Sequence, residues 1–355
     1  GSIVGGDGPG SLSDDIGVAP SADWIAAKAF TAGGTATSES IHAAFEWLIA
    51  PCPVGVSTGS PSCDPTKAPS IINNSWGSSD GGRTEFLPDV QALRAAGIMP
   101  VFSAGNNGPG EGTMGAPGSF SEAFAVGATN SEDGLASFSS RGPSPLATEM
   151  KPDVSAPGAA IRSSIPSDAY ASYQGTSMAA PHVAGLAALM QSGDPTLDVD
   201  TLEDLIRLTA VDLGPSGPDT GYGYGRIDAF RAVGAVVDSG TLVGQVQDAV
   251  SMESLVGVDI LIKGESIHIS TKTNPTGLFS VSYLPAGEYE VSAVLYGYEA
   301  FTPISVTLVA DETADLEIEM TPLPHFTVTG QIYSRGDVFE PVEGATITAL
   351  ETPLQ

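Results

Sequence analysis

The clearest chemical feature of the chain is a serine at the start of an apolar helical run, in the stretch ASYQGTSMAAPHVAGLAALM at 171–190. Gly175 and Thr176 lead into Ser177, and the alanines, valine and leucines after it predict a buried helix that stops near Gly193. A hydroxyl at this place meets the positive end of the helix dipole, and backbone N–H groups without helical partners are available to a developing oxyanion. An ordinary helix N-cap occupies the same place, so position alone leaves Ser177 as either a nucleophile or a cap.

The surrounding string, GTSMAAPHVAG, is one of six that occur in a fixed order along residues 1–236. The other five are GVAPSADWIAAKAF, NNSWGSS, FSAGNNGP, ASFSSRGPS and KPDVSAPG. Together they resemble the subtilisin-like serine proteases of peptidase family S8, and look closest to the bacillopeptidase F-like branch. The G-x-S-x-G elbow of the α/β-hydrolases does not fit, because Ala179 stands where its last glycine should be. The resemblance implies a serine endopeptidase with Ser177 as its nucleophile.

The same resemblance implies roles for residues in two other motifs. Asn106, in SAGNNG, corresponds to the side-chain donor of the oxyanion hole, next to the backbone N–H of Ser177. An amide suits this role because it donates a hydrogen bond without titrating, although the residue alone would also fit a turn in a Gly-rich loop. The positions implied to bind an extended peptide by strand addition are Ser75, Trp76, Gly77, Ser103, Ala104, Gly105, Gly175 and Thr176. Trp76 fits core packing equally well.

The catalytic Asp and His of the family have no counterpart in the sequence given. The family's H-G-T-H segment would lie a few residues before Gly1, because GSIVGGDG resembles the stretch that comes after that segment in the family. His182 lies on the same helix as Ser177 but roughly 140° around it, so we expect it to pack rather than act as a base. The remaining histidines fall on other elements: His42, His268 and His325. We therefore interpret the chain as a fragment that is inactive alone, and Asp153 of KPDVSAPG as structural.

Two other functions stay open. A protease-dead relative would bind a surface or matrix through its C-terminal modules. A sedolisin-type serine-carboxyl peptidase shares the fold, but it uses Glu and Asp and an aspartate in the oxyanion hole. Asn106 and the SMAAPHVAG continuation argue against the sedolisin type.

The elements that must position these residues alternate between strands and helices. Residues 1–20 read as loop. Apolar runs predict strands over 23–30, 70–74, 98–104 and 123–128, and helical spacing predicts helices over 38–49, 86–96 and 200–210. The alternation predicts an α/β fold, a parallel sheet with helices on both faces. The family resemblance implies that this sheet is subtilisin-like and that its N-terminal part is missing. Between the first helix and the second strand, Cys52 and Cys63 lie in a loop rich in Pro, Gly and Ser, where we prefer a disulfide to two free thiols.

The pattern changes to alternating, β-like runs from Thr241 onward. The stretch TNPTGLFSVSYLPAGEYEVSAVLYGYEA resembles the carboxypeptidase regulatory-like family of small β-sandwiches. The sequence also repeats: Val243-Gly244-Gln245-Val246 recurs as Thr329-Gly330-Gln331-Ile332. We predict a truncated peptidase domain at 1–238, a β-sandwich at 241–321 and the truncated start of a second β repeat at 326–355. Such modules usually act as spacers or adhesive units.

The amino-acid composition limits the classes of molecule that the chain could bind. Lys and Arg total 13 against 42 Asp and Glu, and the net charge is −29. This balance argues against nucleic acid or an anionic membrane surface, since both require basic patches. No apolar run is long enough for a transmembrane segment.

We expect a secreted, extracellular protein acting on protein or peptide substrates, with contact to matrix or a cell surface through the β modules. No cofactor is required. Structural calcium fits the family, but the metal site is unknown because no ligand loop can be assigned.

Overall fold

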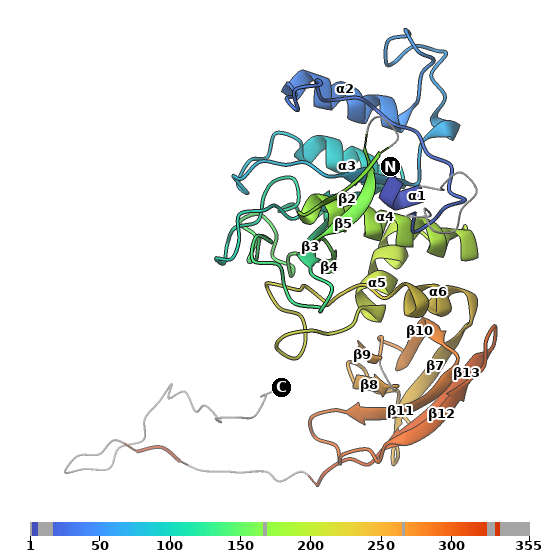
Figure 1. The fold of residues 1–355 in the computed structure, drawn as a ribbon. Helices are drawn as coiled ribbons and strands as arrows, with labels where there is room; N and C mark the ends of the chain where they lie inside the picture. The colour runs from blue at the N-terminus through green and yellow to red at the C-terminus, as the bar shows by residue number, and fades with distance from the viewer. Residues whose placement is uncertain (1, 6–16, 166–168, 265–266, 325–330, 334–355) are drawn as a thin grey trace. The chain divides into compact units, whose positions relative to one another are not determined.

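The computed structural model divides the chain into two compact units, Gly1–Ser239 and Gly240–Gln355. It describes residues 2–5, 17–165, 169–264, 267–324 and 331–333 (Figure 1). The predicted second repeat at 326–355 lies outside the described residues apart from 331–333, and His325 lies outside them as well. Each unit is described by itself.

The first unit is built on four parallel strands in the order β1-β2-β3-β4. These strands are β1 (Ile71–Asn74), β2 (Met99–Ser103), β3 (Phe124–Thr129) and β4 (Val154–Pro157). Every residue of β2 and β3 is buried. This explains why both read as nearly continuous apolar runs, which is typical of parallel strands covered on both faces.

One face of the sheet is covered by α4 (Thr176–Gly193), which contacts all four strands. Because α4 also packs against α1 (Ser2–Gly5), α5 (Val199–Thr209) and α6 (Ala229–Val237), it is apolar almost all round. On the other face, α2 (Ser38–Ile49) and α3 (Leu87–Ala95) share a core with Ile72 and Phe102. The predicted parallel sheet with helices on both faces is confirmed.

Two sequence-based expectations for the N-terminal region are wrong. Residues 2–5 form the short helix α1 rather than a loop, and its Ile3 is buried. Residues 23–30 form no strand, and Trp24 is 65% exposed. A strand needs a hydrogen-bonded neighbour, and no strand among the described residues pairs with this segment. Its apolar composition alone therefore does not make it a strand.

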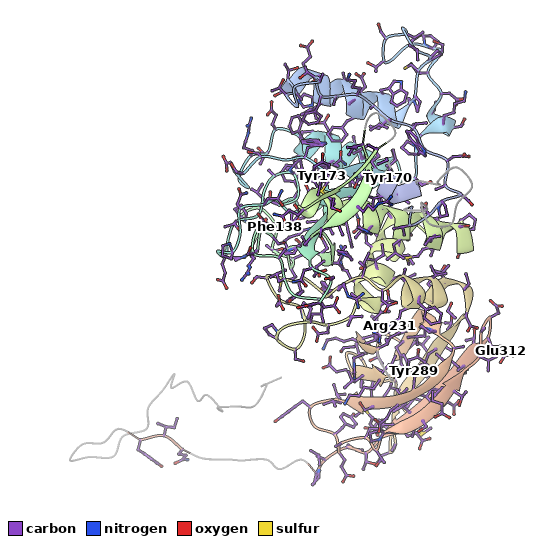
Figure 2. The ribbon with its side chains drawn as sticks, in the orientation of Figure 1. Phe138, Tyr170, Tyr173, Arg231, Tyr289 and Glu312 are labelled. Atoms are coloured by element: carbon purple, nitrogen blue, oxygen red, sulfur yellow. A yellow bond between two sulfur atoms is a disulfide. The ribbon has the colours of Figure 1, made fainter. Side chains whose placement is uncertain are left out.

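Two further features connect these elements. Cys52 and Cys63 form a disulfide in the loop between α2 and β1. The antiparallel hairpin of β5 (Ile161–Ile165) and β6 (Ala169–Tyr173) precedes α4 and was not predicted. The Arg162 guanidinium lies 3.9 Å from the centre of the Tyr170 ring. Tyr170 and Tyr173 both lie on β6 and are labelled in Figure 2.

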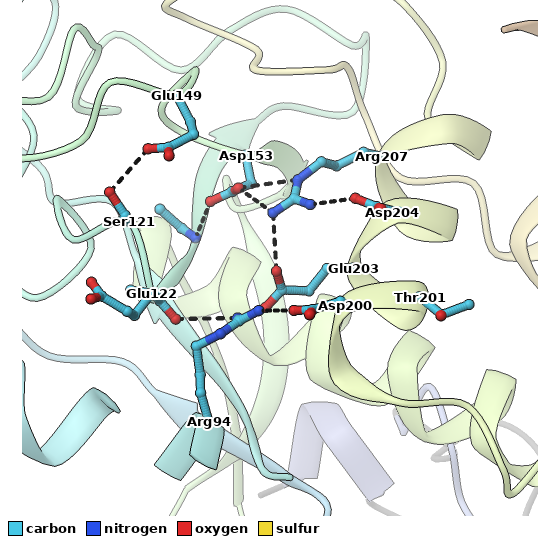
Figure 3. Close-up of polar contacts among 12 residues, drawn as sticks. Arg94, Ser121, Glu122, Glu149, Asp153, Asp200, Thr201, Glu203, Asp204 and Arg207 are labelled. Carbon is cyan, nitrogen blue, oxygen red and sulfur yellow. Dashed lines mark hydrogen bonds and ion pairs between the residues drawn. The ribbon is translucent and has the colours of Figure 1, made fainter. Parts of the chain in front are cut away.

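A cluster of charged side chains connects the segment just before β4 to α5 and α3 (Figure 3). The buried carboxylate of Asp153 accepts from Lys151 Nζ at 2.6 Å and from Arg207 Nη2 at 2.8 Å. Arg207 also pairs with Glu203, which in turn accepts from Arg94. Burial raises the pKa of Glu203 above its ordinary value, although both arginines oppose that shift. Burial would lower the pKa of Arg207, but its carboxylate partners outweigh burial and raise it. Asp153 is therefore structural, as expected.

The second unit consists of two strand layers around one apolar core. One sheet has the order β10-β7-β13 and the other β12-β11-β8-β9. The strands are β7 (Ser239–Asp248), β8 (Asp259–Lys263), β9 (His268–Lys272), β10 (Leu278–Pro285), β11 (Gly287–Val294), β12 (Ile304–Leu308) and β13 (Thr313–Met320). Gly244 lets the Phe279 ring lie against β7, because a Cβ there would come within 2.5 Å of the ring. These sheets agree with the predicted β-sandwich. No described helix in either unit is long and apolar enough to cross a bilayer.

Candidate active site

The candidate site lies where three chain segments meet at the carboxyl ends of the parallel strands. The loop after β1 supplies residues 75–79, the loop after β2 supplies residues 105–107, and the first turn of α4 supplies Ser177. Open parallel sheets bind ligands at this edge, because the strand ends and the helix N-termini face the same way. The Gly/Ser/Asn composition of both loops leaves room for a ligand between them.

Ser177 is not the cap of its helix. The N-cap of α4 is Gly175, whose φ of 148° lies in a region that suits glycine, and no side chain caps the helix. The Ser177 hydroxyl instead donates to the backbone oxygen of Ser75 at 3.2 Å. Ser75 returns a hydrogen bond from its own hydroxyl to the backbone oxygen of Ser177 at 2.8 Å. This reciprocal pair fixes the serine against the loop after β1.

The amide of Asn106 is oriented by the first turn of α4. Its Oδ1 accepts from the backbone N–H of Thr176 at 2.9 Å, and the Thr176 hydroxyl lies 3.0 Å from the same oxygen. With Oδ1 occupied in this way, Nδ2 is the group left to donate. A Cβ at Gly175 would approach Asn106 Nδ2 to 3.4 Å, so glycine keeps this approach open. Asn106 and Ser177 line the same cavity.

This first cavity measures about 250 Å³. Six of the residues implied by the sequence line it: Trp76, Gly77, Ser103, Gly105, Asn106 and Ser177. Two others, Ser75 and Thr176, hold Ser177 and Asn106 through the hydrogen bonds just described, and Gly175 is the N-cap of α4. Ala104 is the exception, because it is fully buried and its backbone bonds Val126 and Gly115. Its side chain therefore packs in the core beside the cavity.

Four lining residues were missed from the sequence: Ser78, Ser79, Asn107 and Gly115. Ser78, Ser79 and Asn107 lie within the NNSWGSS and FSAGNNGP strings, directly after the residues that were assigned a role, so assigning the whole of each string to the site would have found them. Gly115 has no such signal. It reaches the site because its backbone N–H donates to Ala104 and because Ser78 bonds Ala116. A Cβ on Gly115 would come within 2.5 Å of the Ser78 backbone oxygen.

Trp76 both packs in the core and lines the site. Its ring contacts Phe30, Phe45, Phe86 and Phe102, and its Nε1 donates to Asn74 Oδ1 at 3.2 Å. The same ring also lines a second cavity of about 280 Å³ between the loop after β1 and α2. The wall of this second cavity is mostly apolar, and the ion pair Arg83–Glu85 forms part of it.

No histidine or carboxylate among the described residues hydrogen-bonds the Ser177 hydroxyl. His182 Nδ1 contacts the backbone oxygen of Met178 at 2.8 Å, and burial lowers the pKa of this ring despite that contact. His42 pairs with Asp89 between α2 and α3 at 2.9 Å. His268 lies on β9 of the other unit. The described part of the chain also contains no group of three His, Cys, Asp or Glu side chains that could hold a metal ion.

Comparison with known proteins agrees with this geometry. Residues 1–225 match the model of the Subtilase family, and residues 241–321 match that of the Carboxypeptidase regulatory-like domain. Bacillopeptidase F of Bacillus subtilis (strain 168) is 43% identical over 262 residues, which are 71% of this chain and 17% of that protein. Subtilisin DY of Bacillus licheniformis is 35% identical over 219 residues, which cover 61% of this chain and 70% of the relative. The chain therefore spans less than a fifth of bacillopeptidase F.

Proposed function

Because the chain belongs to the subtilase family, we propose that its first unit is the nucleophile-bearing part of a serine endopeptidase. The observation that carries the proposal is the anchored Asn106 amide beside Ser177 at one cavity. Ser177 Oγ attacks the carbonyl carbon of the scissile bond, and the carbonyl oxygen becomes an oxyanion. Asn106 Nδ2 and the Ser177 backbone N–H donate to that oxyanion. This chemistry requires no cofactor.

We further propose that the general base comes from a part of the protein outside residues 1–355. A serine hydroxyl is a weak nucleophile, so a base must take its proton during attack and return it to the leaving amine. Two observations support an external base. The described residues place no base on Ser177, and β1, the strand that leads into the site, is one of the two edge strands of its sheet among the strands that the structure describes. The 355-residue chain alone is therefore inactive in this proposal.

The substrate in this proposal is an extended peptide with a large apolar side chain just before the cleaved bond. The 250 Å³ cavity fits such a side chain, and none of its lining residues is charged. The second cavity, which Trp76 also lines, would hold a further apolar side chain of the same peptide. We place the working protein outside the cell, which the disulfide and the acidic composition favour. The β module then serves as a separable spacer or adhesive unit.

A second candidate function is that of a protease-dead binding protein, favoured by the lack of a base on Ser177 among the described residues. Peptide hydrolysis by the natural gene product that contains residues 1–355 separates the two. The endopeptidase proposal predicts hydrolysis that disappears in Ser177→Ala and is absent from the 355-residue chain alone. A natural gene product that folds but does not hydrolyse any peptide in a diverse library would support the binding protein.

A further inference from the structure

Asn73, in β1, carries a buried side-chain oxygen that is left unsatisfied. Its Oδ1 is shielded from solvent and has no hydrogen-bond partner among the described residues. Its Nδ2, in contrast, donates to Ser75 Oγ at 3.0 Å. Buried acceptors in folded proteins nearly always have a donor, so an unpaired one indicates that a partner is missing.

The Nδ2 end of the Asn73 amide is connected to Ser177 through Ser75. Because Ser75 Oγ accepts from Asn73, its single hydrogen is free to donate to the Ser177 backbone oxygen. The backbone oxygen of Ser75 accepts the Ser177 hydroxyl in turn. Asn73 is thus hydrogen-bonded directly to Ser75, one member of the reciprocal pair that fixes Ser177.

The neighbouring asparagine serves a different part of the site. Side chains alternate across a strand, so Asn73 and Ser75 share the face covered by α4 while Asn74 points to the opposite face. Asn74 Oδ1 accepts from Trp76 Nε1, and its Nδ2 donates to Val101. One asparagine of the pair therefore supports the nucleophile, and the other supports the wall of the substrate cavity.

We propose that Asn73 is a positioning residue that joins Ser177 to the segment supplying the general base. Its Nδ2 holds the serine through Ser75, and its free Oδ1 accepts a hydrogen bond from the base-bearing segment. Among the described strands β1 pairs with β2 alone, which leaves its other edge available to such a segment. The inference rests on the proposed endopeptidase function.

The test compares Asn73→Ala, Asn73→Asp and the matched control Asn74→Ala in the natural gene product that contains residues 1–355. Asn73→Ala is expected to lower kcat about ten-fold and to change KM by less than about two-fold, since it removes two supports of the reacting groups but no substrate contact. Asn74→Ala is expected to change KM rather than kcat. It raises KM for peptides with large apolar side chains, because Trp76 loses its hydrogen bond to Asn74.

Asn73→Asp keeps the oxygen but adds a negative charge near the base. A negative charge stabilises the protonated base, so the pKa on the acidic limb of kcat/KM should rise by about half a unit to one unit. An unchanged kcat in Asn73→Ala, or an unmoved acidic limb in Asn73→Asp, would overturn the inference. If Asn73→Ala does not fold, the near-isosteric Asn73→Asp decides alone. Hydrolysis that persists in Ser177→Ala would overturn the proposed function and this inference together.

Discussion

The backbone N–H of Thr176 donates to Oδ1 of Asn106 at 2.9 Å, across 70 residues of sequence. This bond places the amide of one loop at the first turn of α4, and it decides which end of the amide can reach a ligand. The oxygen is occupied, so the nitrogen donates. An isolated turn asparagine would be free to present either end.

Replacing Asn106 by Ala should lower kcat by about 10²–10³ in the working protease, with little change in KM, because the lost donor acts on the oxyanion. That range is borrowed from a subtilisin that lost the corresponding asparagine. Steady-state kinetics on short peptides measure the effect. Asn107→Ala is the control. Asn107 also lines the cavity but has no bond to Thr176, so its loss should change KM rather than kcat. Equal effects on kcat would argue against the oxyanion role.

The uncharged cavity should select large apolar or aromatic side chains just before the cleaved bond. A buried Lys or Arg would find no carboxylate there, and desolvating an unpaired charge is costly. A peptide-library cleavage profile reads out the preference. Dominance of basic residues at that position would contradict the assignment of the cavity.

Much of this site can be predicted from the sequence, but some of it depends on contacts that no local pattern shows. Helix α2 could be predicted because its apolar positions recur at helical spacing, and Thr37 and Ser40 form a capping box at its start. The place of Gly115 in the site could not be predicted, because it lines the site through bonds to distant loops. Ala104 has the right motif but faces the core, since motif matching does not say which way a side chain points. The segment 23–30 has the composition of a strand but no partner strand among the described residues.

The buried cluster around Asp153 should dominate the response of the first unit to charge removal. Asp153→Asn leaves the buried Lys151 and the partly buried Arg207 without their main counter-charge, which should lower the free energy of unfolding by about 3–5 kcal/mol. Asp204→Asn removes another partner of Arg207, but that carboxylate is 78% exposed. It should therefore cost less than about 0.5 kcal/mol. Urea unfolding of both variants measures the difference, and similar losses would show that the cluster is not a stabilising core.

Asp248 should make the second unit sensitive to acid. Backbone N–H groups of Ser251 and Val250 hold the pKa of this carboxyl below its ordinary 3.8, and the Tyr298 hydroxyl also donates to it. A pKa that is lower in the folded state means that the ionised group stabilises the fold above pH 3.8 and that this contribution is lost as the pH falls below that value. Thermal unfolding of residues 240–324 between pH 2 and pH 6 should show the loss. In Asp248→Asn the dependence should be weaker, and an unchanged slope would refute the assignment.

The account depends most directly on Ser177 being a nucleophile that lacks only its base. Labelling with a fluorophosphonate, which reacts with activated serines, tests this claim, and peptide mass spectrometry locates the adduct. We predict no adduct on the 355-residue chain alone, and an adduct on Ser177 in the natural gene product that disappears in Ser177→Ala. Labelling of Ser177 in the isolated chain would show a base within residues 1–355, and no labelling in a folded natural gene product would contradict the protease function.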